Sequence, residues 1–405
     1  MRQLFHLTAC LFSSNLLIQA QTVGCTDKLA TNFNANATIN DGSCLYATTP
    51  ITFLSSLTID ATLKETSGLI HWENLFWSHN DDNDNKIYAI HTTTGSIDSS
   101  ITLNGLEIHD WEELQHDSLY LYIGDMGNNT TGIRQNLAVY KITKSSLFSS
   151  TLLVDTIHFS YAAQIDFSTS TSNTTNFDCE AFIVSADSIY FFAKEWTHKK
   201  STIYSIPNQA GHHTAQPIFE LDVNGLITGA CWAANKDAIV LCGYSTILQP
   251  FIYMITDLDQ YNFSKANKRK LTFNNLLGYQ TEAIATADGH IFYLTNEQFS
   301  MGGTTIQQQI HTVDLSNFFP KKNTISIKEN AIENVKIYPN PSHDIIVIDN
   351  ATAGLYEIIN NQGQIVQMIT LQMPSTTIDV SRLSAGSYFL KKQHSPSGIK
   401  FIIQQ

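Results

Sequence analysis

Short apolar runs recur along the middle of the chain. They are four or five residues long, rich in β-branched and aromatic side chains and bounded by turn-forming residues, as at 119–123, 189–192 and 291–294. The apolar positions alternate with polar ones or follow each other directly, and they do not repeat with the 3.6-residue period of a helix. The pattern predicts an all-β fold of short strands and excludes a helical solenoid.

Five segments between residues 50 and 330 share a layout of four such strands. Each segment opens on a short motif, and the second residues of these motifs are 45 to 68 positions apart: Ser67, Glu112, Glu180, Gly229 and Glu282. Four-stranded units at this spacing are typical of β-propeller blades. Residues 52–60 form a strand with no motif before it, and we expect this strand to close the ring by joining the last blade. The count predicts five blades; six, with the ends of the block forming an irregular extra blade, is the alternative.

Composition and charge narrow the possible partners. Of the 405 residues, 43% are hydrophobic and only 15% are charged, so the chain can build a large core. The 36 acidic and 23 basic side chains leave a formal net charge of −13, which disfavours nucleic acid as a partner. No run of 18 or more apolar residues occurs, so we expect no transmembrane segment.

The first twenty residues predict an export signal. Arg2 is followed by an apolar stretch and by Ala20, after which cleavage would leave Gln21 as the first residue. A lipoprotein signal ending at Cys10 is the alternative. Export implies an oxidising compartment, in which paired cysteines form disulfides.

The cysteines after the signal fall into two groups. Cys25 and Cys44 lie near the two ends of residues 21–49, a segment with almost no core-forming residues that needs a disulfide to close it. The others lie within predicted strands, where we expect buried free thiols, with a bridge between the last two as the alternative: Cys179, Cys231 and Cys242.

Residues 331–405 consist of short strands separated by turns and predict a small immunoglobulin-like β-sandwich. The segment 338–341 reads Tyr-Pro-Asn-Pro, and the segment 383–388 reads Leu-Ser-Ala-Gly-Ser-Tyr. Through these motifs the block resembles the type A C-terminal sorting domain of the type IX secretion system, although it ends in two glutamines where that family usually ends in a basic residue. The resemblance implies the secretion machinery as a partner, and a protein that is secreted or attached to the outer cell surface.

The segment 21–49 resembles a "GCTD…DDGSC" module found near the start of many exported bacterial proteins. Its Asp and Asn side chains are suited either to Ca²⁺ binding or to turn formation. The predicted organisation is a signal peptide, a disulfide-stapled module, a β-propeller and a sorting domain, at residues 1–20, 21–49, 50–330 and 331–405.

The repeated motif position predicts a metal site. The first strand of each propeller blade lines the central channel, so equivalent positions of successive blades converge on the axis. Unpaired carboxylates brought together there repel each other unless their pKa values rise or a cation lies between them. A set of oxygen ligands without His or Cys favours Ca²⁺ or Mg²⁺, and we expect an axial Ca²⁺ held by Ser67, Glu112, Glu180 and Glu282. The alternative is that the glutamates accept hydrogen bonds from backbone N–H groups of neighbouring strands.

A second set of polar side chains lies where second strands end and in the adjacent loops. Around a channel mouth such side chains bind a phosphate, a sugar or a peptide. The candidate ligand-binding residues are His79, Asp81, His109, Asp125, Arg134, Lys194 and Glu297. Motifs of a nucleophile elbow, a zinc protease or a phosphate-binding loop do not occur.

Two families of propellers resemble the middle block. The segment 110–114, Asp-Trp-Glu-Glu-Leu, together with 122–129 is similar to a set of uncharacterised exported propellers, and the blade openings more distantly resemble the calcium-activated nucleotidases. The second resemblance implies five blades and an axial Ca²⁺. The leading function is a Ca²⁺-stabilised propeller that binds an extracellular ligand, and the alternative is a metal-dependent hydrolase of phosphoesters, phosphoanhydrides or glycans. A third class, purely structural adhesion, would leave the side chains around Asp125 and Lys194 unused.

Overall fold

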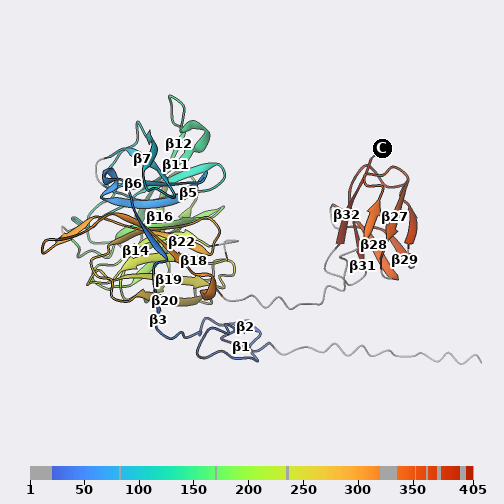
Figure 1. The fold of residues 1–405 in the computed structure, drawn as a ribbon, viewed down its shortest axis with the longest axis horizontal. Helices are drawn as coiled ribbons and strands as arrows, with labels where there is room; N and C mark the ends of the chain where they lie inside the picture. The colour runs from blue at the N-terminus through green and yellow to red at the C-terminus, as the bar shows by residue number, and fades with distance from the viewer. Residues whose placement is uncertain are drawn as a thin grey trace, which may run out of the picture. The chain divides into compact units, whose positions relative to one another are not determined.

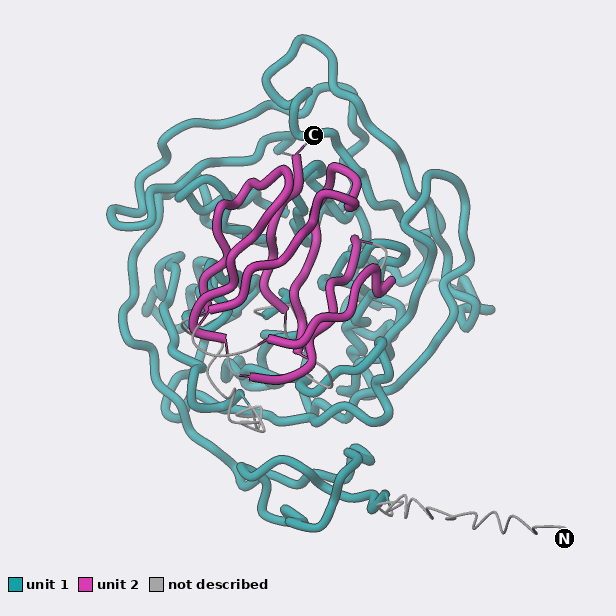
Figure 2. The backbone as a smooth tube through the Cα atoms, turned by 90° about the vertical axis from the view of Figure 1, so that its right-hand side faces the viewer, with its two compact units in different colours: residues 1–320 teal, residues 321–405 magenta. Residues whose placement is uncertain are grey.

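The chain forms two compact units, residues 1–320 and 321–405 (Figures 1 and 2). The computed structural model describes residues 21–81, 84–168, 171–233, 237–319, 335–351, 353–361, 364–371, 375–392 and 398–404. The predicted export signal at residues 1–20 lies outside the described residues. Both units are built of β-strands, as the apolar pattern predicted, and each is described by itself below.

The larger unit consists of sheets in which strands that follow each other in the chain lie side by side. The strands of the first two groups are β5 (Thr66–Trp72), β6 (Leu75–Asn80), β7 (Lys86–His91) and β8 (Ile97–Thr102), then β9 (Trp111–His116), β10 (Tyr120–Asp125), β11 (Leu137–Thr143) and β12 (Val154–Tyr161). The next groups are β13 (Asp178–Val184), β14 (Ser188–Lys194), β15 (Ser201–Pro207) and β16 (Gly211–Leu221), then β17 (Leu226–Trp232), β18 (Ile239–Tyr244), β19 (Pro250–Thr256) and β20 (Asn267–Phe273). The last group is β21 (Thr281–Thr286), β22 (Ile291–Asn296) and β25 (Gln309–Asp314), with the small hairpin β23 (Phe299–Met301) and β24 (Thr304–Ile306) between the last two.

The first strands of these groups form a closed ring. Strand β5 contacts β9, β9 contacts β13, β13 contacts β17, β17 contacts β21, and β21 contacts β5 again. Figure 2 looks onto this ring. A closed ring of radially arranged antiparallel sheets is the β-propeller fold, which the repeated four-strand layout predicted.

The ring is closed by the segment predicted to do so. Strand β4 (Ser55–Thr58) pairs antiparallel with β25 and completes the last sheet. Strand β3 (Thr49–Ile51) pairs in parallel with β20 of the preceding sheet. Residues near the start of the unit therefore cover strand edges at its end, which removes exposed edges.

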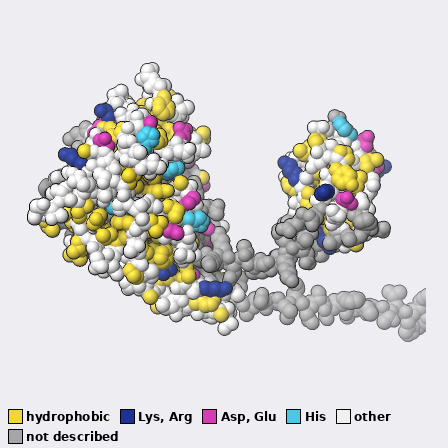
Figure 3. Space-filling model, viewed as in Figure 1, with side chains coloured by type: hydrophobic (Ala, Val, Ile, Leu, Met, Phe, Trp, Pro, Cys, Tyr) yellow, Lys and Arg dark blue, Asp and Glu magenta, His cyan; other side chains and the backbone are white. Residues whose placement is uncertain are grey.

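The core lies between neighbouring sheets. One cluster of fully buried side chains joins β13–β15 to β17–β19 and includes Phe192, Leu241 and Phe251. Both faces of most strands are covered, which is why the apolar runs are continuous instead of alternating. Burying each such large side chain contributes about 1.5–3 kcal/mol. Charged side chains are few and scattered on the face of the larger unit in Figure 3, in keeping with the low charged fraction.

The module before the propeller has the predicted disulfide between Cys25 and Cys44. The Nδ2 group of Asn40 donates to Asp257 Oδ2 and to Asn267 Oδ1, both at 2.8 Å, so the module packs on the propeller beside β20. Several of its Asx side chains accept hydrogen bonds from the backbone two residues further on, as Asp27 does from Leu29. Such bonds are typical of turns. Turn formation is one of the two roles that the sequence allowed for these side chains, the other being Ca²⁺ binding.

The remaining cysteines, Cys179, Cys231 and Cys242, are buried free thiols. They lie in β13, β17 and β18 and pack in the core beside apolar side chains. The structure therefore agrees with the first of the two readings of these residues, and the bridge between the last two is not formed.

The smaller unit consists of two antiparallel sheets around one core. The sheets are β26 (Lys336–Tyr338), β27 (Ile345–Asp349) and β30 (Ser375–Asp379), and β29 (Ile365–Leu371), β28 (Gly354–Asn360), β31 (Gly386–Lys392) and β32 (Gly398–Ile403). Ile346, Ile358 and Phe401 are fully buried between them.

Candidate functional site

Each inner strand of the propeller is irregular at one place. Its pairing with the second strand of the sheet skips a residue, or two residues in β5. The skipped residues are Ser67 and Gly68, Glu112, Glu180, Thr228 and Glu282. Such β-bulges re-aim a side chain and are frequent beside active sites. The motif position found in the sequence thus has a common backbone geometry, although in β17 it falls at Thr228, one residue before Gly229.

Two of these bulge residues, Glu112 and Glu180, lie close to a third buried carboxylate, that of Asp178. One oxygen each of Glu112, Asp178 and Glu180 lie within 4.8 Å of one another. Asp178 is anchored, because its Oδ1 accepts from the backbone N–H of Asn128 at 2.7 Å and its Oδ2 from Trp196 Nε1 at 2.8 Å. Within the described part of the chain the carboxylate of Glu112 accepts no hydrogen bond. These three residues are called the axial carboxylates below.

Asp178 is not among the site residues predicted from the sequence. A signal for it existed, because an Asp lies two residues before each of Glu112 and Glu180, and residues two apart on a strand share a face. Asp110, the partner of Glu112 in this pattern, is also part of the site. Burial, followed by the charge of Asp178, raises the pKa of Asp110 to about 7, while Arg134 acts in the opposite direction.

A buried ammonium group lies against the axial carboxylates. Lys194 Nζ is 2.5 Å from both carboxylate oxygens of Glu180, and both side chains are almost fully buried. The ammonium also lies over the rings of Trp196 and Tyr244, 4.7 and 5.1 Å from their centroids. Burial opposes the charge on Lys194, but Glu180 and the neighbouring acids raise the pKa of Lys194 well above its ordinary value. Lys194, expected among the ligand-binding residues, is therefore a counter-ion within the site.

Burial is also the main reason why the pKa values of Glu112, Glu180 and Glu282 lie well above the ordinary range. The charge of Glu180 raises the pKa of Glu112 further, and Lys194 acts in the opposite direction on Glu180. Glu297 raises the pKa of Glu282 further, whereas Lys194 and the adjacent Glu180 carboxyl group lower it. The structure brings the three glutamates of the repeated position into one electrostatically coupled group.

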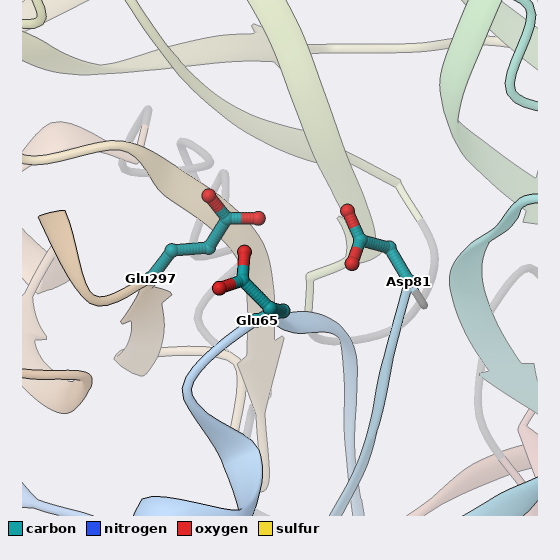
Figure 4. A group of neighbouring side chains, drawn as sticks. All are labelled: Glu65, Asp81 and Glu297. Atoms are coloured by element: carbon teal, nitrogen blue, oxygen red, sulfur yellow. The ribbon is translucent and has the colours of Figure 1, made fainter. Parts of the chain in front are cut away.

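A second group of carboxylates adjoins the first. Glu65 precedes β5, Asp81 follows β6 and Glu297 follows β22, and one oxygen of each lies within 4.8 Å of the others. Figure 4 shows the carboxylates of Glu65 and Glu297 turned toward each other, with that of Asp81 facing them. Burial, then Asp81 and Glu65, raise the pKa of Glu297 well above its ordinary value. These residues are called the outer carboxylates. Asp81 and Glu297 were predicted from the sequence, and Glu65 was not.

Acidic residues from the two polar sets inferred from the sequence lie close together. The register pairs Thr66 with Asn80 and Asp178 with Lys194, so inner strands begin where second strands end. The charge of Asp81 acts on both Glu112 and Glu282. The axial and outer carboxylates therefore belong to one acidic mouth of the propeller.

Asp125 organises a loop at the edge of this mouth. Its fully buried carboxylate accepts from His109 Nδ1 at 2.9 Å, from Arg134 Nη2 at 2.8 Å and from the backbone N–H of Asp110 at 3.0 Å. Arg134 also donates to the carbonyl oxygen of Gly127 at 2.6 Å, so its guanidinium holds the loop in place. His109 is partly exposed, at 38%, and its Nε2 atom has no hydrogen-bond partner among the described residues.

Two expected site residues have structural roles instead. His79 is fully buried; its Nε2 accepts from the N–H of Gly68 at 3.3 Å and its Nδ1 donates to the carbonyl of Asn80 at 2.8 Å. Burial lowers the pKa of His79 to about 4, so the ring stays neutral. The hydroxyl of Ser67 donates to the carbonyl oxygen of Glu112 at 2.6 Å and joins β5 to β9. Neither side chain faces the mouth with an unused donor.

Glu113 links strands that are not neighbours in the ring. Its Oε2 accepts from the N–H of Ala230 in β17 at 2.9 Å and its Oε1 from the N–H of Leu114 at 3.0 Å. Gln115 adds a bond from its Nε2 to the carbonyl of Ala230 at 2.7 Å. Burial raises the pKa of Glu113 well above its ordinary value, and the two N–H groups act in the opposite direction. Backbone capping by a glutamate, the alternative considered for the repeated position, is thus found one residue later.

Comparison with known proteins identifies the C-terminal unit. Residues 336–404 match the family described as "Secretion system C-terminal sorting domain", and no curated protein matches the chain. Similar solved structures include a glucose dehydrogenase (9% identity, TM-score 0.40, covering 64% of this chain and 98% of that one) and a gluconolactonase from Xanthomonas campestris (11%, 0.37, 68% and 96%). Another is a chain of the mitotic checkpoint complex (11%, 0.31), of which this chain spans 61%.

The described residues contain no helix long and apolar enough to cross a membrane. The family match agrees with the motifs at 338–341 and 383–388. The chain ends in a type IX secretion sorting domain that addresses it to the secretion machinery, and it is a secreted or surface-attached protein with a β-propeller.

Proposed function

We propose that this protein is a secreted, five-bladed propeller that holds a divalent cation, Ca²⁺ above all, at its acidic mouth and binds an extracellular ligand there. The count of five rests on the ring of β5, β9, β13, β17 and β21, each of which is the first strand of one antiparallel group. The smaller unit is proposed to be an immunoglobulin-like sandwich, because its two antiparallel sheets enclose a common core.

The carboxylate of Glu112 carries the proposal. It is buried and accepts no hydrogen bond from the described residues, and burying a charge without a partner is costly. Gly127 lies against it, and a Cβ atom at that position would overlap Glu112 Oε1 and Asp110 Oδ2. The backbone is thus shaped to leave room for these oxygens. Since every side-chain donor of the group is a carboxylate oxygen, the chemistry fits a hard cation such as Ca²⁺ or Mg²⁺.

Lys194 supplies part of the positive charge but not all of it. Its ammonium is engaged with both oxygens of Glu180, which leaves Glu112 and Asp178 facing the same space. The proposed cation is therefore held chiefly by Glu112, Asp178 and one side of Glu180, with Glu282 beside it. In this arrangement Ser67 is no ligand, because its hydroxyl is bonded to a carbonyl oxygen.

The charge of the mouth also constrains the ligand. The outer carboxylates lie beside the axial ones, so the mouth attracts cations and repels free phosphate or carboxylate groups. An anionic ligand would bind only through the metal ion. A cationic ligand would contact Glu65, Asp81 and Glu297 directly.

One observation favours the second candidate function, a metal-dependent hydrolase. His109 and Asp125 form a dyad in which the buried carboxylate fixes Nδ1–H and leaves Nε2 as a proton acceptor. A cation at the axial carboxylates would polarise a substrate oxygen. His109 would then take a proton from water, and Asp110 would hold or release one, as its pKa of about 7 allows.

Thermal unfolding in Ca²⁺ and in a chelator tests the proposed function. We expect the full chain to melt at a higher temperature with Ca²⁺, and Glu112→Gln to lose this difference. Glu107→Gln, at an exposed position outside the carboxylate groups, is the matched control and should keep it. Unchanged melting of the wild type on chelation refutes the cation site. Ca²⁺-dependent turnover of nucleotides, phosphoesters or glycans that is lost in His109→Gln would favour the hydrolase over the binding protein.

A further inference from the structure

Two histidines lie face to face on the outer part of the propeller, at the seam between two sheets. His158 on β12 and His212 on β16 are directly opposite each other in the parallel pairing of these strands. Their ring centroids are 4.6 Å apart and the ring planes differ by 13°. Within the described part of the chain neither imidazole has a hydrogen bond or an ion pair.

The seam exists because β16 belongs to two sheets. Its residues 211–215 pair with β12, whereas its residues 216–221 pair with β15. The histidine pair lies in the first half, where β16 is attached to the sheet of β9–β12. Parallel pairing places directly opposite side chains on the same face of a sheet, so the stacking follows from the register.

Both rings can be reached from solvent. His212 is exposed and His158 is partly exposed, and His158 also lines a cavity of about 530 Å³. On its other side His158 is paired with Ala138 of β11, whose small side chain leaves the imidazole room to turn. Ser160 and Thr214, the next opposed pair on the same face, add two exposed hydroxyl groups.

We propose that His158 and His212 bind a divalent transition-metal ion of the class that prefers imidazole nitrogen, namely Zn²⁺, Ni²⁺ or Cu²⁺. Two nitrogens bound to one tetrahedral ion lie roughly 3.3 Å apart at metal–nitrogen distances of 2.0–2.1 Å. To bring one nitrogen of each ring into this range, both rings rotate about their side-chain bonds out of the nearly parallel stack. Water completes the coordination, with Ser160 and Thr214 placed to hydrogen-bond to it.

This site differs from the acidic mouth in its chemistry and does not depend on the proposed function. The mouth offers carboxylate oxygens, which suit Ca²⁺, and the seam offers nitrogens, which Ca²⁺ does not favour. A metal ion at the seam joins β12 to β16 and therefore links two neighbouring sheets at their outer edges. Since the ion binds the folded chain, it raises the stability of the propeller as its concentration rises above the dissociation constant.

Calorimetric titration of the full chain with Ni²⁺ in excess Ca²⁺ tests the proposal, with Ca²⁺ present to occupy the carboxylates. The chain contains 14 histidines, so each variant is compared with the wild type instead of with zero binding. We expect His158→Ala and His212→Ala each to lose one equivalent of Ni²⁺ or to bind it at least tenfold more weakly. His213→Ala is the matched control, because its side chain points to the opposite face and its Nε2 is bonded to the carbonyl of Gln209.

Two further readouts make the result decisive. Ni²⁺ should raise the melting temperature of the wild type and of His213→Ala, but not of the other two variants. The electron paramagnetic resonance spectrum of bound Cu²⁺ should show hyperfine coupling to two imidazole nitrogens in the wild type. In His158→Ala it should show coupling to at most one. Equal binding by all variants, or an equal loss in His213→Ala, overturns the assignment to the stacked pair.

Discussion

Removal of the ammonium of Lys194 probes the electrostatics of the acidic mouth. Lys194→Met keeps an unbranched apolar side chain of nearly the same length and removes its charge. At 2.5 Å and an effective dielectric constant of about 20, a pair of unit charges attract each other by roughly 6–7 kcal/mol. Desolvation offsets part of this attraction, and breaking a buried ion pair typically costs about 3–5 kcal/mol. We expect the free energy of unfolding of Lys194→Met to fall by about 3–5 kcal/mol when no divalent cation is present.

The response to Ca²⁺ distinguishes a cation site from a simple ion pair. Without the ammonium, the carboxylates carry more uncompensated charge and bind a divalent cation more tightly. Ca²⁺ should therefore raise the unfolding free energy of Lys194→Met by more than it raises that of the wild type.

Urea unfolding in a chelator and in excess Ca²⁺ measures both effects. All five tryptophans of the chain precede residue 233, so tryptophan fluorescence reports on the propeller alone. Lys200→Met is the control, because the pair of Lys200 with Glu220 is exposed and solvent screens its attraction. A Lys194→Met protein as stable as the wild type in chelator would refute the ion-pair reasoning. An equal gain from Ca²⁺ in both proteins would place the cation elsewhere.

Four further predictions follow from the structure. Glu113→Gln places an amide beside the buried N–H of Ala230 and should lower the unfolding free energy by about 1–3 kcal/mol in urea, whereas no change would mean that the bond contributes nothing. Gly127→Ala should weaken Ca²⁺ binding at least tenfold in calorimetry with an unchanged circular dichroism spectrum, and an unaltered affinity would disprove the close contact with the axial carboxylates. Burial lowers the pKa of His311 to about 4; the unfolded ring titrates near 6.5, so this residue's stabilising contribution is complete above pH 6.5 and is lost as the pH falls toward 4. Amide hydrogen exchange in β4, which pairs with the strand of His311, should become faster as the pH falls over this range. An exchange rate that shows no such acceleration would contradict the predicted loss of stability. Replacing both Cys25 and Cys44 by Ser should open the module to proteolysis, and resistance equal to the wild type would show that packing alone holds it.

Much of the fold follows from local patterns in the sequence. Continuous apolar runs predict strands buried on both faces, and their recurrence in groups of four predicts the propeller. Ring closure by β4 was predictable because residues 52–60 have strand character but no motif of their own. Pairing of β12 with β16 was not, because residues 211–215 extend β16 beyond its pairing with β15, and Pro217 within the strand suggests a break instead.

Residues of the candidate site could be predicted only where they occupy the repeated motif position. Glu112, Glu180 and Glu282 stand out because each occupies the same motif position. Glu65 lies outside that position, and its place beside Asp81 and Glu297 is set by strand register. The ion pair between Lys194 and Glu180 likewise depends on a contact between neighbouring strands, which the composition does not reveal. His79 was assigned to the mouth from its place near a strand end, but its face of β6 is buried.

Direct measurement of Ca²⁺ binding tests the central claim. Isothermal titration of the metal-free full chain should show Ca²⁺ binding at the mouth that Glu112→Gln and Gly127→Ala weaken at least tenfold and that Glu107→Gln leaves unchanged. Ca²⁺ binding that is equal in all four proteins, or no binding by the wild type, would contradict the account.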